Sequence, residues 1–222
     1  MRWDVRVLAV ALVSGSASML GALSTTRFAG LWTLPLANLF LWFGFLCAFV
    51  YALARSRPPG LFQFRASDLI WGFASGMVLR LCEGVVGGFE NAPFPSSPLI
   101  ENNAIASWVL AEAIPLGLIG PLAEEVFFRA VILVSVFQVL RRATGPVAAA
   151  ITAALVSTGL FVCLHAIFGA ISLASVLQFV LIGTVCAALV LLTGRLWSAV
   201  VTHLVYNGSY LAIVAMGALL VR

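Results

Sequence analysis

The chain has 222 residues, of which 63% are hydrophobic and only 9% are charged. Charged side chains take about 25% of positions in soluble domains, so this composition excludes an ordinary soluble protein and predicts an integral membrane protein. The formal net charge of +4 comes from twelve arginines and no lysine. In a membrane protein, a basic balance is first a signal of topology, and we expect no nucleic-acid partner.

Seven apolar stretches predict a polytopic bundle of transmembrane helices, because about 20 apolar residues cross a bilayer as a helix. They are Val7–Leu23, Leu34–Leu53, Leu69–Phe89, Ala104–Leu140, Val147–Ala166, Ile171–Thr193 and Leu196–Val221. The fourth would be about 55 Å long against a hydrocarbon core of about 30 Å. We expect it to bend near Pro115 or Pro121, or to run past the membrane surface. The all-α fold then has about seven spans, or eight if this stretch splits.

The arginines predict a cytoplasmic N-terminus. In that orientation only Arg27 and Arg222 fall outside, and a larger set falls on the cytoplasmic side. This larger set is Arg2, Arg6, Arg55, Arg57, Arg65, Arg141, Arg142 and Arg195. The first stretch, with its basic start, apolar centre and small-residue end, also has the pattern of a cleaved signal peptide, whose removal would leave six spans.

Ionisable groups within the spans carry the functional information, because each costs about 2.5–3.5 kcal/mol at the bilayer centre. Arg80 and Glu83 are three residues apart on one helix face and can form a structural ion pair. Glu112 stands alone, and its spacing favours no particular role. The four cysteines lie in apolar stretches and lack the spacing of a metal site or of paired thiols.

Three four-residue spacings suggest one polar cavity. They join Glu125 with Arg129, Phe161 with His165, and His203 with Asn207. The first spacing suits an ion pair along one helix and leaves Glu124 turned away from it by about 100°. A hairpin centred near Gly145 would set Glu125 level with His165 and Glu124 one residue away. His203 and Asn207 can share that depth from the last span.

A carboxylate, two imidazoles and an amide in a partly dry cavity suit hydrolysis. Glu124 beside His165 can hold and deprotonate a water, while His203 and Asn207 can donate to an oxyanion. The same Glu124, His165 and His203 could instead ligate zinc, since two histidines and one glutamate form a common catalytic set. The chain lacks the H-E-x-x-H motif of many zinc proteases and the G-x-S-G motif of membrane serine proteases. Its only aspartates are Asp4 and Asp68, which excludes a paired-aspartate intramembrane protease.

The stretches "EEVFFR", "FVCLH" and "HLVYN", in this order on late spans, resemble the motifs of the CPBP family of CAAX proteases and bacteriocin-processing enzymes, also called Abi. The resemblance covers about residues 104–214, and Ala130 stands where the family often has glycine. We therefore divide one membrane domain into three N-terminal spans, residues 1–103, and a catalytic core, residues 104–222.

The resemblance implies a membrane endopeptidase, in a bacterial plasma membrane, whose cavity opens to the cytoplasm and whose substrate is a membrane-associated peptide or protein. By motif position Glu124 would be the base and His165 would help to activate water. His203 and Asn207 would form the oxyanion site, while Glu125, Arg129 and Phe161 would support the cavity. We favour metal-free chemistry, with zinc as the alternative cofactor. A catalytically silent scaffold or immunity factor is a second hypothesis, and a small proton-coupled transporter is a third.

Overall fold

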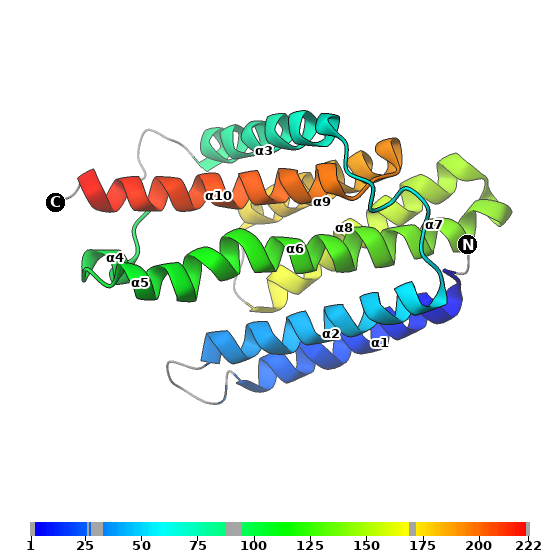
Figure 1. The fold of residues 1–222 in the computed structure, drawn as a ribbon, viewed down its shortest axis with the longest axis horizontal. Helices are drawn as coiled ribbons and strands as arrows, with labels where there is room; N and C mark the ends of the chain where they lie inside the picture. The colour runs from blue at the N-terminus through cyan, green and yellow to red at the C-terminus, as the bar shows by residue number, and fades with distance from the viewer. Residues whose placement is uncertain (1–2, 26, 28–32, 88–94, 169–171, 221–222) are drawn as a thin grey trace.

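The computed structural model of the chain describes residues 3–25, 27, 33–87, 95–168 and 172–220. It is all-α over these residues and has no strand among them (Figure 1), which confirms the predicted helical bundle. Six of the helices are long and apolar enough to cross a membrane. They are α1 (Val5–Thr25), α2 (Thr33–Arg55), α3 (Ala66–Gly87), α8 (Pro146–Phe168), α9 (Leu173–Thr193) and α10 (Trp197–Leu220). The predicted limits Phe89, Ile171 and Val221 lie outside the described residues.

The expected fourth span is one continuous helix of mixed turn types from Ile105 to Thr144, preceded by the short α4 (Pro98–Glu101). It consists of α5 (Ile105–Trp108), η1 (Val109–Ala113), η2 (Pro115–Ile119), α6 (Gly120–Glu124), η3 (Glu125–Leu133) and α7 (Val134–Thr144), where η marks π-helical turns. Pro115 and Pro121 lack an N–H donor, and their rings would clash with the preceding turn of a regular α-helix. The wider π-helical turns next to them accommodate both effects, so the helix continues without a break. The stretch therefore does not split in two.

Helices α1 and α2 form an antiparallel pair along one side of the bundle (Figure 1). They approach closely because Gly44 lies against Ser18, where a Cβ on the glycine would overlap the serine side chain. Small residues at such contacts are typical of helix packing in membranes. At the start of α1, the buried Trp3 indole donates hydrogen bonds to the carbonyls of Ala52 and Ser56, 2.8 Å each. These bonds tie the start of α1 to the end of α2.

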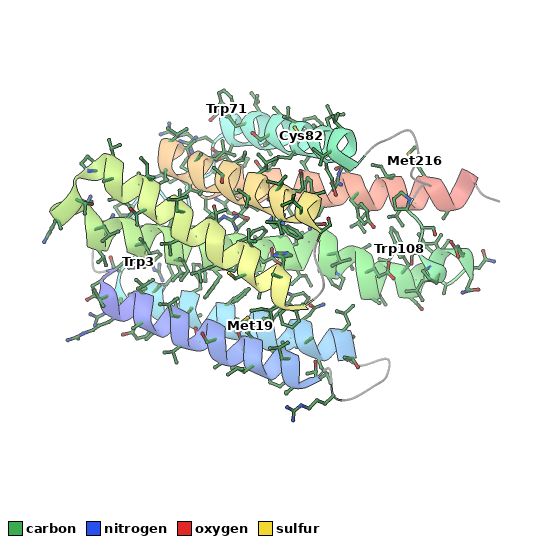
Figure 2. The ribbon with its side chains drawn as sticks, turned by 180° about the vertical axis from the view of Figure 1, so that it is seen from behind. Trp3, Met19, Trp71, Cys82, Trp108 and Met216 are labelled. Carbon is green, nitrogen blue, oxygen red and sulfur yellow. The ribbon has the colours of Figure 1, made fainter. Side chains whose placement is uncertain are left out.

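Helix α3 lies beside α10, and both start at the same end of the bundle (Figure 1). Gly72 lies against Ser198 and Val201, and Gly76 lies against Thr202 and Val205, so the two helices run parallel in register. Figure 2 shows the extent of the bundle, with Trp3 near one end and Trp108 and Met216 toward the other.

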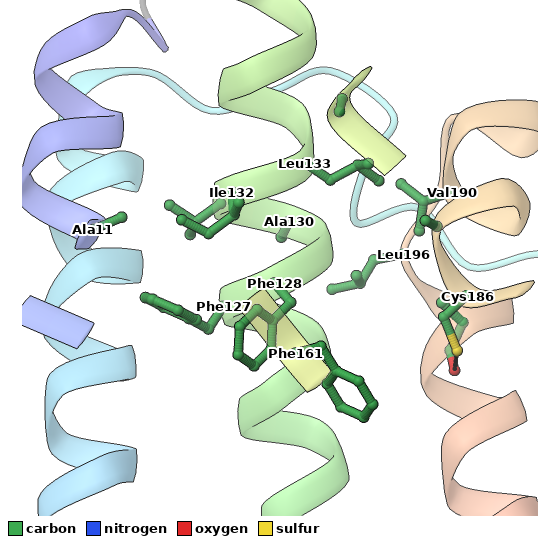
Figure 3. Close-up of a cluster of buried hydrophobic side chains, with 14 of the residues drawn as sticks. Ala11, Phe127, Phe128, Ala130, Ile132, Leu133, Phe161, Cys186, Val190 and Leu196 are labelled. Atoms are coloured by element: carbon green, nitrogen blue, oxygen red, sulfur yellow. Dashed lines mark hydrogen bonds between the residues drawn. The ribbon is translucent and has the colours of Figure 1, made fainter. Parts of the chain in front are cut away.

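The hydrophobic core surrounds η3, which passes through the middle of the molecule (Figure 3). Phe127 stacks on Phe45 of α2, with ring centroids 4.2 Å apart, while Phe128 contacts Phe161 of α8 edge to face at 5.6 Å. The carbonyl of Phe128 also accepts a hydrogen bond from Ser157 at 2.9 Å. The hairpin at Gly145 therefore pairs α8 with η3 close to the predicted register.

Candidate active site

A cavity of about 450 Å³ lies between α2, α3, the long helix, α8, α9 and α10. All four predicted catalytic side chains line it: Glu124, His165, His203 and Asn207. They come from three separate helical segments, α6, α8 and α10, so the cavity exists only in the folded bundle. Phe161, Phe179 and Ile182 form part of its apolar wall.

Glu125 is fully buried and holds two partners. Its Oε1 lies 3.1 Å from Nη1 of Arg129, which is the ion pair expected from the four-residue spacing. The same oxygen lies 2.9 Å from Nδ1 of His203 on α10. The sequence reasoning missed this second contact, because spacing along one helix carries no information about a partner on another.

Arg129 is also fully buried, and its guanidinium lies 4.6 Å above the ring of Phe161. A planar cation over an aromatic face is favourable when it is desolvated. Phe161 also contacts the imidazoles of His165 and His203, with ring centroids at 4.6 and 5.9 Å. The side chain of Phe161 thus packs against Arg129 and both histidines.

Glu124 is oriented differently from its neighbour Glu125. Its side chain is 19% exposed and lines the cavity, and its Oε2 lies 3.9 Å from Nε2 of His203. His203 therefore lies between the two carboxylates, with Nδ1 toward the buried Glu125 and Nε2 toward Glu124. This separation of the adjacent glutamates agrees with the prediction that Glu124 is turned away from the Glu125–Arg129 pair.

His165 is fixed by its own helix, because Nδ1 lies 2.9 Å from the carbonyl of Phe161, which can only accept a hydrogen bond. Nδ1 is therefore the protonated nitrogen, and Nε2 is left for another partner. The His165 ring packs against Phe179 of α9 with centroids 4.3 Å apart. No sequence signal distinguished Phe179 from the other aromatic residues of its span.

Asn207 is anchored by an irregularity of the long helix. Its Nδ2 donates a 2.7 Å hydrogen bond to the carbonyl of Leu116 in η2. Within a π-turn this carbonyl would accept from the residue five positions later, which is Pro121 and has no N–H. The carbonyl is thus available to Asn207, and the second N–H of the amide is left for another acceptor.

A second polar network lines the same cavity from α3. Arg80 pairs with Glu83, as predicted, and donates to the carbonyl of Tyr206 at 2.6 Å and to the hydroxyl of Ser209 at 3.2 Å. The Tyr206 hydroxyl donates to Glu83 at 2.7 Å. The ion pair therefore belongs to the cavity wall. Glu112, whose role the sequence left open, accepts a hydrogen bond of 3.2 Å from the Ser97 hydroxyl.

The donor set for the zinc alternative is Glu124, His165 and His203. Among the residues that the structure describes, no three His, Cys, Asp or Glu side chains are grouped so that they could hold a metal ion. The arrangement present in this structure therefore does not fit a resident zinc.

Residues 106–209 match the family model described as "Type II CAAX prenyl endopeptidase Rce1-like". This region of the chain is therefore similar to that family of endopeptidases. The match confirms the resemblance to CAAX proteases and supports an intramembrane endopeptidase. It includes all four candidate catalytic residues and begins just after the three N-terminal spans. Comparisons with curated proteins and with solved structures gave no match.

Proposed function

We propose that the protein is an intramembrane endopeptidase that hydrolyses a peptide bond of a membrane-associated protein or peptide with a water activated by Glu124. The observation that carries the proposal is the convergence of Glu124, His165, His203 and Asn207 on one cavity. The Rce1-like match supports the reaction class independently. Prenylated C-terminal peptides, which the family description names, are the first substrates to test.

The first step is attack by water on the scissile carbonyl carbon. Glu124 accepts one proton of the water, because its carboxylate lies in the cavity and has no hydrogen-bond partner among the described residues. The free Nε2 of His165 helps to hold the same water. The carbonyl π bond opens, and its electrons move to the carbonyl oxygen, which becomes an oxyanion.

The second step is collapse of the tetrahedral intermediate. The remaining N–H of Asn207 and, when both nitrogens of the ring are protonated, Nε2–H of His203 donate to the oxyanion. Glu125 supports this role because it fixes Nδ1 of His203 at 2.9 Å. The C–N bond then breaks, and the departing amine takes the proton that Glu124 received, so the carboxylate is regenerated.

Turnover by the reconstituted protein tests the proposal. A panel of membrane-anchored and prenylated C-terminal peptides would be offered to the wild type and to the Glu124→Gln and His203→Ala variants. We expect cleavage by the wild type alone. Equal turnover by all three proteins would refute the assigned roles, and no turnover by any of them would favour a non-enzymatic scaffold.

A chelator arm tests the proposed absence of a metal. We expect turnover to be unchanged after prolonged treatment with a strong chelator and dialysis, and metal analysis of the purified protein to give less than one zinc per chain. Loss of activity that zinc restores would replace the metal-free scheme with a zinc-dependent one.

A further inference from the structure

A second cavity, of about 500 Å³, lies where the long helix turns into α8, and we call it the α7–α9 groove. Its walls are one face of α7, the start of α8, the end of α9 and the loop after α2. It shares no lining residue with the candidate active site. Apart from Gln138, the residues around it are apolar. Val147 and Ile151 are exposed, so the groove opens on the outer surface of the bundle.

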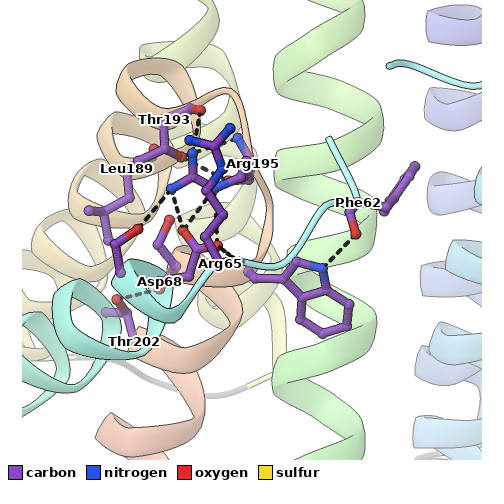
Figure 4. Close-up of polar contacts among 10 residues, drawn as sticks. Phe62, Arg65, Asp68, Leu189, Thr193, Arg195 and Thr202 are labelled. Carbon is purple, nitrogen blue, oxygen red and sulfur yellow. Dashed lines mark hydrogen bonds and ion pairs between the residues drawn. The ribbon is translucent and has the colours of Figure 1, made fainter. Parts of the chain in front are cut away.

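Hydrogen bonds fix the loop that forms one wall of the groove. The backbone N–H of Leu196 donates to the carbonyl of Leu61 at 2.8 Å, and the indole of Trp197 donates to the carbonyl of Phe62 at 2.9 Å (Figure 4). The Leu61 side chain is 4% exposed and lines the groove. The loop is therefore fixed against the start of α10, and the apolar wall that it forms belongs to the folded bundle.

A smaller cavity, of about 290 Å³, adjoins the groove because Gln138 lines both. Its other lining residues come from the start of α1 and the end of α7, and they include Arg141 and Arg142, so we call it the arginine cavity. Arg141 follows Val134 by seven residues and therefore lies on the same face of α7 as the groove. The apolar groove thus leads to two guanidinium groups about one helical turn beyond Gln138.

The arginine cavity carries an excess of positive charge. Arg141 and Arg142 are exposed, and neither has an ion-pair partner among the residues that the structure describes. Asp4 also lines this cavity, but it lies 3.5 Å from Arg55, which balances its charge. Guanidinium groups bind phosphate oxygens through paired, charge-assisted hydrogen bonds. The cavity is therefore suited to a phosphate group.

A second copy of this chain has no free carboxylate to place there. Asp4 is paired as described, and Arg195 forms a bidentate contact with Asp68 at 2.8–3.1 Å (Figure 4). All six glutamates lie between positions 83 and 125 of the sequence, whereas the two arginines lie in the last turn of α7. An amphiphile with an apolar chain and an anionic head matches both cavities, and the surrounding bilayer contains such molecules.

We propose that the α7–α9 groove and the arginine cavity together bind one anionic phospholipid. An acyl chain lies along Val134, Phe137 and Ile151, and the phosphate lies between Arg141 and Arg142. This lipid site is separate from the candidate active site and does not depend on the proposed function. Because the lipid contacts α7, α8 and α9 only in the folded bundle, its binding also stabilises the protein against unfolding.

Native mass spectrometry of the purified protein in a neutral detergent tests the charge of the ligand. The protein is titrated with phosphatidylglycerol and with phosphatidylcholine that carry the same acyl chains. Arg141→Gln combined with Arg142→Gln removes the two cations of the arginine cavity. The matched control, Arg6→Gln combined with Arg27→Gln, removes the same charge from exposed positions that line neither cavity.

A second pair of variants tests the groove. Ala150→Phe places a ring in it, whereas Ala148→Phe places the same ring on an exposed position of α8 outside it. We expect the wild type and both controls to bind phosphatidylglycerol about tenfold more tightly than phosphatidylcholine, because each unpaired arginine adds to the attraction. The double arginine variant should bind the two lipids equally, and Ala150→Phe should bind both more weakly than Ala148→Phe does.

Three results would overturn the proposal. The first is equal binding of the two lipids by the wild type, or an unchanged preference in the double arginine variant. The second is a rise in Tm with inorganic phosphate as large as that with phosphatidylglycerol, which would leave a site for a free anion. The third is a dimer of the wild type that Ala150→Phe dissociates, which would assign the groove to a second copy of the chain.

Discussion

Glu124 and Glu125 are adjacent, but Glu125 is buried in an ion pair and Glu124 faces the cavity. Replacement by glutamine should therefore destabilise the protein at Glu125, and at Glu124 it should abolish turnover with little change in stability. Glu125→Gln removes the carboxylate that pairs with the fully buried Arg129, and it weakens the contact with His203. Breaking a buried ion pair by removing one partner costs about 3–5 kcal/mol. For a chain of this size that corresponds to a fall in Tm of about 6–20 °C.

The matched control is Glu124→Gln. In the wild type the Glu124 side chain lines the cavity and is 19% exposed, and its carboxylate has no hydrogen-bond partner among the described residues. We expect a stability change within about 1 kcal/mol, together with loss of turnover because the proposed base is gone. Thermal unfolding in one detergent, followed by intrinsic tryptophan fluorescence, gives the first quantity, and the peptide assay gives the second.

A double variant separates loss of charge balance from loss of packing. Glu125→Leu with Arg129→Met removes both buried charges, and such replacements are often neutral or stabilising. Its Tm should therefore lie above that of Glu125→Gln. Equal Tm values for Glu124→Gln and Glu125→Gln would refute the reasoning, as would a double variant that is less stable than Glu125→Gln.

Three further predictions concern individual contacts. Asn207→Ala should lower kcat by about 10²–10³-fold if its amide donates to the oxyanion, whereas a change confined to stability would assign it to anchoring Leu116. Gly44→Ala should destabilise the α1–α2 pair by about 1–3 kcal/mol through overpacking against Ser18. Ser18→Gly should relieve only part of this cost, because the carbonyl of Ser14 also lies 2.7 Å from the added Cβ; no rescue at all in the unfolding assay would contradict the contact with the Ser18 side chain. Asp68→Asn should cost about 1–3 kcal/mol, because the buried Asp68 loses its charge-assisted bonds to Arg195. A Tm equal to that of the wild type would show that the pair is energetically neutral.

The sequence predicted those parts of the site whose information is local. The spacing of Glu125 and Arg129 predicted an ion pair along one helix, and the structure has it at 3.1 Å. The turn at Gly145 predicted the pairing of α8 with the long helix, and the contact between the rings of Phe128 and Phe161 lies within one residue of the predicted register. Both predictions succeeded because helix periodicity and a short hairpin fix relative positions without reference to the rest of the chain.

Contacts between distant helices were beyond this kind of prediction. The bond from Glu125 to His203 joins residues 78 positions apart, and the anchoring of Asn207 on Leu116 joins residues 91 apart. Each depends on how the long helix, with its π-turns, is rotated against α10. The sequence contained a signal for the second contact in Pro121, which releases the carbonyl of Leu116, but not the identity of the donor.

Composition, apolar periodicity and three motifs by themselves determined that this chain is a membrane-embedded helical bundle with CAAX-protease-like residues. These properties follow from hydrophobicity and helix geometry, which act residue by residue. Only the tertiary structure decided that the buried Glu125 also contacts His203 of α10, and that Asn207 is held by the carbonyl of Leu116. It also decided that Glu124, His165, His203 and Asn207 line one cavity, because helix packing brings distant segments together and a linear sequence does not contain that packing.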